Sequence, residues 1–377
     1  MDNKQQILEE IANTIVTHSL GVANGDKVLI RFKNQETFPL LKLIISKIFE
    51  QGGIPFVKFA HQELDDILMS NYDVKDLEEV LKRREFDVLN HDCFISLGYN
   101  ISYDKIFNNN AFRYEYAQAK RELDTIYNSK RWVLVNYPSF LDAKKLDLSY
   151  EDCFDKLMKY IAVDYKKMEE AMVPLKLRMD NAQNVRIVAK DTDLTFSKQS
   201  ITSRILAGTS NLPDGEIYSA PIKNSINGYI QFNIDSSFAG DVFKNIRLEF
   251  CDGRVVGATT ENGKDEILNE ILNQDEGARY VGEFAFGTNP NITNPITDTL
   301  YDEKMLGSIH LALGNCYPDA DNGNSSCIHW DMIKYLKKEY GGGKVYFDDE
   351  LVMDDGLFVP QSLKSLNKED NSYEQNR

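Results

Sequence analysis

Cysteine is scarce in this sequence, and no two cysteines stand at the spacing of a metal-binding or redox motif. The 377 residues include five cysteines, an odd number, and these are dispersed along the chain. They are Cys93, Cys153, Cys251, Cys316 and Cys327. This usage favours reduced thiols in a cytoplasmic protein over a framework of disulfide bonds.

Long hydrophobic runs and an excess of basic residues are also absent. No run reaches the about 18–20 apolar residues that a membrane-spanning helix needs, and the first residues, MDNKQQILEEIANTIV, are polar and amphipathic. With 43 basic and 59 acidic residues, the net charge is −16. Nucleic acids and anionic membranes are bound by clustered lysine and arginine. We therefore expect a soluble cytoplasmic protein with neither a nucleic acid nor a membrane as partner.

Two familiar sequence motifs are missing. No GxGxxG follows the first predicted strand, which leaves a dinucleotide-binding site unsupported, and no HExxH occurs. Histidine is rare, with five in the chain. His18, His61 and His91 have no acidic or cysteine neighbour at a metal-binding spacing, so we interpret them as surface or core residues.

Hydrophobic periodicity in the first half predicts alternating strands and helices. Segments 28–32 and 54–60 are apolar strands, and the residues between them have helical spacing with glycine after the helix end. Segments 93–99 and 131–138 indicate further strands. A strand–helix–strand unit indicates a parallel, buried sheet. The predicted fold class is α/β, with a Rossmann-like open sheet and its helices at the N-terminus.

The pattern changes near residue 180, after a helical stretch in two pieces over 150–179. Short strands and hairpins then dominate, and Asp252-Gly253 is typical of a hairpin turn. We predict an N-terminal α/β domain over 1–180, a C-terminal mixed α+β domain over 181–365, and a polar tail over 366–377. The length is sufficient for two domains with their own cores.

Four stretches of the second half combine acids and histidines with glycine, proline and asparagine. They are TSNLPDGEIYSAP, GEFAFGTNP, YDEKMLGSIHLALGNCYP and GNSSCIHWDM. This composition predicts shaped loops, where binding and catalytic sites are often built. The candidate metal ligands in these stretches are Glu216, Glu283, Glu303, His310, His329 and Asp331.

Carboxylates and imidazoles without thiolates suit zinc, manganese or cobalt in a hydrolytic site. One catalytic zinc ion needs three protein ligands, whereas six candidates fit two ions about 3.5–4 Å apart that share a carboxylate. The residues alone leave a simpler interpretation open, in which the acids cap helices and line turns. In CIHWDM, His329 and Asp331 would share one face of a strand, as metal ligands, an acid–base pair or a polar sheet edge. Trp330 would then point to the core.

In these four stretches the sequence resembles the thermophilic metallo-aminopeptidases of the aminopeptidase T, aminopeptidase S and PepS type. That family carries NLPxGE…AP, GE…GTNP, DE…H-x-ALG and N-S-x-IH-x-D segments in this order. Here they read NLPDGEIYSAP, GEFAFGTNP, DEKMLGSIHLALG and NSSCIHWDM. The likeness extends to DTDLTFS at 191–197 and to GDKVLIRF near the N-terminus, so it spans nearly the whole chain.

The resemblance implies a metallo-aminopeptidase that removes the N-terminal residue of short peptides with a free N-terminus. It implies two divalent ions (zinc, cobalt or manganese) that activate water, and a homodimer. The residues on the family's ligand positions are Glu216, Glu283, which bridges the ions, His310, His329 and Asp331. Glu303 falls on a further acidic position, as a ligand or as the general base. Tyr317 matches an active-site tyrosine, which can donate a hydrogen bond to the oxyanion.

Two features depart from many relatives. The loop between Tyr317 and Asn324 is short, with the sequence PDADNG, and HWDM is only one version of the last segment. The alternative to a peptidase is therefore a metal-binding scaffold, or a metallohydrolase that acts on another amide. Cys316 and Cys327 are close to the site in sequence, and we expect neither to bind a metal.

Overall fold

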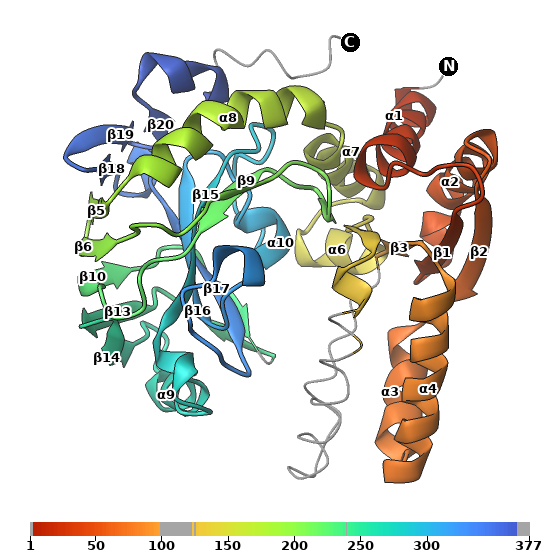
Figure 1. Ribbon diagram of the computed structural model, residues 1–377, viewed down its shortest axis with the longest axis horizontal. Helices are drawn as coiled ribbons and strands as arrows, with labels where there is room; N and C mark the ends of the chain where they lie inside the picture. Colours follow the sequence, from red (N-terminus) through yellow and green to blue (C-terminus); the bar gives the residue numbers. More distant parts are fainter. Residues whose placement is uncertain (1–2, 99–122, 124–125, 239, 368–377) are drawn as a thin grey trace. The chain divides into compact units, whose positions relative to one another are not determined.

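The computed structural model describes residues 3–98, 123, 126–238 and 240–367, which form two compact units (Figure 1). The first unit comprises Met1–Ala162 and Gly208–Asp214, and the second comprises Val163–Ala207 and Gly215–Arg377. The domain boundary predicted near residue 180 stays a prediction. The two compact units are divided between Ala162 and Val163. Most of the predicted polar tail, from residue 368 onward, lies outside the described residues.

The first unit is built on a five-stranded sheet in which all neighbouring strands are parallel, as the strand–helix–strand pattern predicts. The Rossmann-like character of this sheet stays a prediction. In spatial order the strands are β2 (Ile54–Phe59), β1 (Lys27–Phe32), β3 (Cys93–Leu97), β4 (Arg131–Val135) and β8 (Asn211–Leu212).

Helices connect these strands. Helix α2 buries Leu40, Leu41, Ile44 and Ile48 at helical spacing, and Gly52 follows its end with a positive φ of 77°. The helical segments whose bounds lie within the described residues include α1 (Asn3–Asn13), η1 (Thr14–Ser19), η2 (Gln35–Thr37), α2 (Phe38–Glu50), α3 (Gln62–Asn71), α4 (Val74–Asn90), α6 (Phe140–Lys145) and α7 (Tyr150–Ile161).

The expectation of a uniformly buried parallel sheet is wrong for β2. Strand β1 is buried through Val28, Leu29 and Ile30, but Phe56 and Phe59 of β2 are exposed. The reason is position: β2 lies at the edge of the sheet and pairs only with β1 among the strands described. Among the described residues, no helix combines the length and apolar character needed to span a bilayer.

The second unit contains antiparallel sheets. The largest has eight strands, in the order β14 (Arg254–Thr259), β13 (Arg247–Cys251), β10 (Asn227–Gln231), β6 (Thr192–Ser197), β5 (Asn184–Ala189), β18 (Gly343–Phe347), β19 (Glu350–Asp354) and β20 (Leu357–Phe358). Asp252 and Gly253, both with positive φ, form the predicted turn between β13 and β14.

A second antiparallel sheet of five strands carries the candidate site. Its order is β17 (His329–Tyr335), β16 (Ser308–Gly314), β15 (Val281–Gly287), β9 (Glu216–Ser219) and β7 (Arg204–Leu206). A small hairpin pairs β11 (Ser236–Phe238) with β12 (Asp241–Phe243). The helical segments are α8 (Tyr165–Asn181), α9 (Asp265–Leu272), η3 (Gly277–Arg279), α10 (Thr299–Asp302), η4 (Pro318–Ala320), η5 (Lys338–Tyr340) and η6 (Gln361–Leu366).

One face of the five-stranded sheet packs on the eight-stranded sheet and forms the core of this unit (Figure 1). The ring of Phe284 on β15 lies 5.1 Å from that of Phe196 on β6. The ring of Phe286 lies 6.0 Å from that of Phe347 on β18. Because side chains alternate along a strand, the other face of the same sheet is left for polar residues.

Candidate metal centre

The structure brings the six candidate ligands together on the five-stranded sheet. Glu216 begins β9, Glu283 lies on β15, His310 on β16, and His329 and Asp331 on β17; Glu303 directly follows α10. The expectation of loops is therefore wrong for Glu216, Glu283 and His310, which lie on strands. His329 and Asp331 lie on a strand, as the interpretation of CIHWDM has it.

The glycines in these stretches permit another segment of backbone to pass close to the strands. They lie on or beside the strands, where another backbone passes too closely for a side chain. A Cβ atom on Gly287 would be 2.3 Å from the Met305 carbonyl oxygen, and one on Gly314 would be 2.2 Å from that of Ile328.

Strand register places the candidate residues on one face of the sheet. Asp331 on β17 pairs with Ala312 on β16, and Ala312 pairs with Glu283 on β15. His310 precedes Ala312 by two residues, so its side chain points to the same face. Glu216 pairs with Gly287, four residues after Glu283, and therefore also shares this face. His329 shares it because it precedes Asp331 by two residues.

A β-bulge in β15 turns Glu283 toward this face. Val281 pairs with Leu313, but Glu283 pairs with Ala312, so the register shifts by one residue between them. Without the shift, Val281 and Glu283 would point to the same side. The bulge keeps Val281 in the core and directs Glu283 to the polar face.

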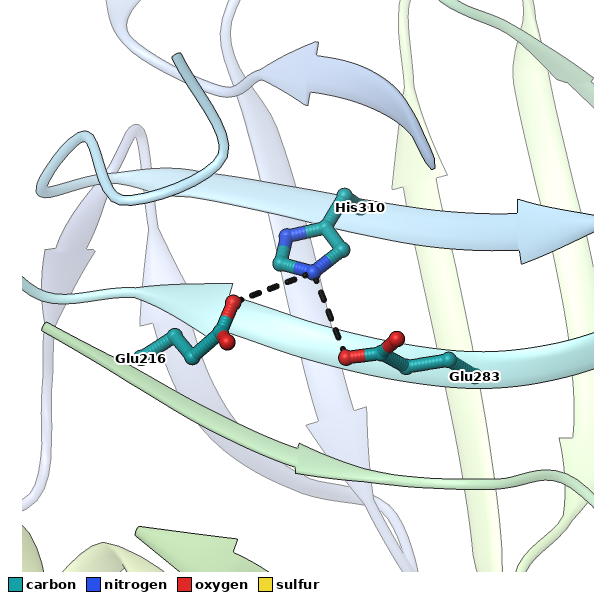
Figure 2. A group of neighbouring side chains, drawn as sticks. All are labelled: Glu216, Glu283 and His310. Atoms are coloured by element: carbon teal, nitrogen blue, oxygen red, sulfur yellow. Dashed lines mark ion pairs between the residues drawn. The ribbon is translucent and has the colours of Figure 1, made fainter. Parts of the chain in front are cut away.

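Figure 2 shows the imidazole of His310 between the carboxylates of Glu216 and Glu283. Its Nε2 atom lies 3.4 Å from Glu216 Oε2 and 3.5 Å from Glu283 Oε1. The Nε2 atom of His329 lies 3.2 Å from Glu283 Oε2 and 3.6 Å from Asp331 Oδ1. Glu283 therefore faces both histidines, one with each of its oxygens.

These side chains form three overlapping groups whose ligand atoms lie within 4.8 Å of one another. The groups are Glu216 with Glu283 and His310; Glu283 with His329 and Asp331; and Glu303 with His310 and Asp331. Glu283 belongs to the first two groups, and Asp331 to the last two.

The donor atoms fit divalent metal ions. His329 Nδ1 lies 2.8 Å from the Asn315 carbonyl oxygen, which orients Nε2 toward the carboxylates. This Nε2 atom is buried and faces Glu283 Oε2 at 3.2 Å. A buried imidazole nitrogen among carboxylate oxygens is a suitable ligand for zinc, cobalt or manganese.

Charges within the cluster shift the pKa values of the metal-free side chains. Burial lowers the pKa of His329, but Asp331 and Glu283 outweigh it and raise that pKa to about 10. Burial raises the pKa of Glu303 to about 8. The pKa of Glu283 is lowered to about 2, because hydrogen bonds from His310 and His329 outweigh its burial. Carboxylates held this closely favour a bound cation.

Tyr317 lies beside the cluster, at the start of η4. Its ring is 4.9 Å from that of His329 and 5.1 Å from that of Tyr218, and 41% of the residue is exposed. Partial burial and the negative charges of the neighbouring Glu283 and Asp331 raise the pKa of Tyr317 above its usual value. The phenol therefore keeps its proton and is a hydrogen-bond donor at neutral pH.

Sequence reasoning missed Lys304. Only 1% of its side chain is exposed, and its Nζ atom lies 2.5 Å from Glu216 Oε1 and 2.9 Å from Glu303 Oε1. The signal was its place directly after Glu303 in a stretch rich in candidate ligands. A lysine is ordinarily exposed, so burial could be foreseen only with the tertiary contacts in hand.

The remaining predictions near the site concern Trp330 and two cysteines. Trp330 lies in the core, as predicted: it packs on Phe238 and Phe243, and its Nε1 donates to Ser236 Oγ at 2.8 Å. Cys316 is buried and Cys327 is exposed. Across the described residues, neither thiol belongs to a group that could hold a metal ion.

The chain is similar to known proteins over most of its length. Residues 4–358 match the family model described as thermophilic metalloprotease (M29). Aminopeptidase PepS of Streptococcus thermophilus is 24% identical over 372 residues, which cover 88% of this chain and 89% of that protein. Aminopeptidase 2 of Geobacillus stearothermophilus is 27% identical over 244 residues, which cover 54% of this chain and 58% of that relative.

Among solved structures, wild-type AmpT from Thermus thermophilus superposes with a TM-score of 0.76. The alignment covers 94% of this chain and 100% of that chain at 18% sequence identity. At this identity the likeness establishes the fold.

Proposed function

Because the chain belongs to the thermophilic metalloprotease (M29) family, we propose that it is a metal-dependent aminopeptidase. Its substrates would be short peptides with a free N-terminus, from which it hydrolyses the N-terminal peptide bond. The observation that carries the proposal is the convergence of Glu216, Glu283, Glu303, His310, His329 and Asp331 on one face of a sheet.

Two divalent ions (zinc, cobalt or manganese) would be held by this cluster. Glu216 and His310 would bind one ion, His329 and Asp331 the other, and Glu283 would bridge them. When bound, such ions lower the pKa of water to near neutrality and polarise the scissile carbonyl. The i, i+2 spacing of His329 and Asp331 supports this arrangement, because both side chains leave one strand on the same side.

Two further residues would act on the substrate. Tyr317 would donate a hydrogen bond to the carbonyl oxygen as negative charge develops on it. Glu303 would serve as the general base that accepts a proton from water, unless it proves to be a ligand. The position of Tyr317, with its ring 4.9 Å from that of His329, supports the first role.

Metal-free protein tests the proposal directly. Hydrolysis of a broad panel of aminoacyl amides and short peptides is measured after addition of zinc, cobalt or manganese. We expect activity on substrates with a free α-amine, and none on their N-acetylated counterparts. Absence of hydrolysis with every ion across the whole panel would reject the aminopeptidase.

A second candidate is a metal-binding scaffold, or a metallohydrolase acting on another amide. The short segment after Tyr317 favours this candidate, because many relatives have a longer loop there and the substrate pocket would differ. Asn322 holds the segment in place by donating hydrogen bonds to the carbonyl oxygens of Pro221 and Val281 at 2.8 Å each. Metal analysis separates the possibilities. Two ions per chain with slow peptide turnover would favour another amide, whereas no bound ion would favour a scaffold.

The assembly and location of the protein stay predictions. The family resemblance suggests a homodimer, which light scattering of the purified protein tests through its molecular mass. A mass close to the chain's 43.2 kDa would contradict it. The cytoplasmic location is an expectation from cysteine usage and from the lack of long apolar runs.

A further inference from the structure

Lys304 is a buried cation within a cluster of carboxylates. Its Nζ atom contacts Oε1 of Glu216 at 2.5 Å and Oε1 of Glu303 at 2.9 Å. Glu216 uses its other oxygen, Oε2, to face His310 Nε2 at 3.4 Å. The ammonium group and the histidine therefore take opposite oxygens of the same carboxylate.

The backbone around Lys304 is fixed in place. The Asn289 amide donates to the Lys304 carbonyl oxygen at 2.8 Å, and the Leu306 amide donates to the Asn289 carbonyl oxygen at 3.1 Å. This segment lies over Gly287, where a Cβ atom would be 2.3 Å from the Met305 carbonyl oxygen and 2.8 Å from that of Glu303. These backbone contacts hold the segment that carries Lys304 in place.

We infer that Lys304 is a positioning residue of the metal centre, which restricts Glu216 and Glu303 to one metal-facing oxygen each. The inference rests on the proposed metal site. A carboxylate can bind an ion with one oxygen or with both. An ammonium group bonded to Oε1 blocks the two-oxygen mode, so Oε2 is the oxygen that remains for an ion or for water.

Charge gives this role a measurable consequence. The cluster holds four carboxylates, those of Glu216, Glu283, Glu303 and Asp331. Lys304 forms ion pairs with two of them, Glu216 and Glu303. In metal-free protein its charge stabilises two of them, whereas in loaded protein it is repelled by the bound cations. Loss of Lys304 must therefore destabilise the metal-free state more than the loaded state, which strengthens metal binding by linkage.

The test compares the Lys304→Met variant with wild type. We expect zinc to bind about tenfold more tightly, and kcat to fall at least tenfold with a smaller change in KM. The visible absorption of bound cobalt should weaken, because extra carboxylate oxygens raise its coordination number. Lys198→Met is the matched control: Lys198 is also fully buried and its Nζ donates to the Ile201 carbonyl oxygen, so metal affinity and cobalt spectrum should stay unchanged.

A double variant keeps the inference testable if Lys304→Met does not fold. Glu303→Gln with Lys304→Met removes the Glu303 carboxyl together with the Lys304 ammonium group that contacts it, so stability should recover in part, while Glu216 can use both oxygens. The weaker cobalt absorption should therefore persist. Zinc binding that is unchanged or weaker in Lys304→Met, or a wild-type cobalt spectrum in the double variant, would overturn the inference.

The inference and the proposed function fail in different ways. Wild-type peptidase activity together with unaltered metal binding in the variants removes the role of Lys304 and leaves the aminopeptidase intact. Tighter zinc binding in Lys304→Met, with no peptide hydrolysis by loaded wild-type protein, rejects the aminopeptidase and leaves the role of Lys304 intact.

Discussion

At the scale of single residues, the site depends on which atom of each side chain faces inward. His329 is oriented by the contact of its Nδ1 with the Asn315 carbonyl oxygen. Glu216 is oriented by Lys304, which takes one of its oxygens. Such contacts fix the orientation of a ligand before an ion arrives.

Replacing Asp331 with alanine tests the ligand assignment. Asp331 belongs to two of the three ligand groups, so its loss should remove one ion and lower activity by at least 100-fold. Metal content is measured by elemental analysis after dialysis. Asp349→Ala, at a turn outside these groups, is the control. Two fully occupied ions in Asp331→Ala would refute the assignment.

Replacing Tyr317 with phenylalanine separates catalysis from metal binding. The variant lacks only the hydroxyl, so kcat should fall about 100-fold as an oxyanion donor is lost, with metal content unchanged. Steady-state kinetics and elemental analysis measure the two effects. Tyr229→Phe, on β10 of the other sheet, should behave as wild type. Unaltered kcat in Tyr317→Phe would exclude the donor role.

At the scale of elements, one antiparallel sheet directs core residues to one face and the candidate ligands to the other. Its strands direct aromatic residues such as Phe284 and Trp330 into the core, and ligands to the opposite face. The bulge between Val281 and Glu283 is needed for this division, because it changes the side on which Glu283 lies. Gly287 permits the segment with Glu303 and Lys304 to lie over β15.

Gly287→Ala tests this close approach. The new methyl group would meet the Met305 carbonyl oxygen at 2.3 Å, so the segment must move and carry Glu303 and Lys304 away. We expect a loss of about 1–3 kcal/mol in unfolding free energy, measured by urea denaturation, together with weaker activity.

Gly257→Ala is the matched control for this substitution, because it also lies on a strand. Its Cβ would meet only side-chain atoms of Glu249, the nearest at 3.1 Å. Equal stability of the two variants would show that the contact over Gly287 is not tight.

At the scale of the whole molecule, buried lysines make stability depend on pH. Burial lowers the pKa of Lys198 and of Lys334 from 10.5 to about 8. Between pH 8 and 10.5 the unfolded chain holds a proton at each position that the folded protein has released. At these two positions unfolding therefore takes up protons, so the contribution of the two lysines to the unfolding free energy rises with pH through this window.

The Lys198→Met variant measures the contribution of Lys198 to the pH dependence of the unfolding free energy. For metal-free wild type, the unfolding free energy should gain at most about 1.4 kcal/mol per pH unit from Lys198 between pH 8 and 10.5. The difference between wild type and variant, from urea denaturation at several pH values, should show this slope. A difference that is constant with pH would mean that Lys198 is not shifted in the folded protein.

Much of the architecture could be predicted from local pattern. Helical spacing located α2, alternation located β17, and Asp252-Gly253 located a hairpin turn, because each signal lies within a few neighbouring residues. The exposure of β2 could not be predicted, since edge position depends on which strands pair.

The sequence by itself determined which residue types are available for the site. Its four stretches supplied every candidate ligand, and the i, i+2 spacing at His329 and Asp331 determined that these two share a face. Only the tertiary structure decided how ligands from different strands meet, because register and the bulge act across strands. Only it placed Lys304 against two glutamates, since a buried ion pair depends on contacts between segments 88 residues apart, from Glu216 to Lys304.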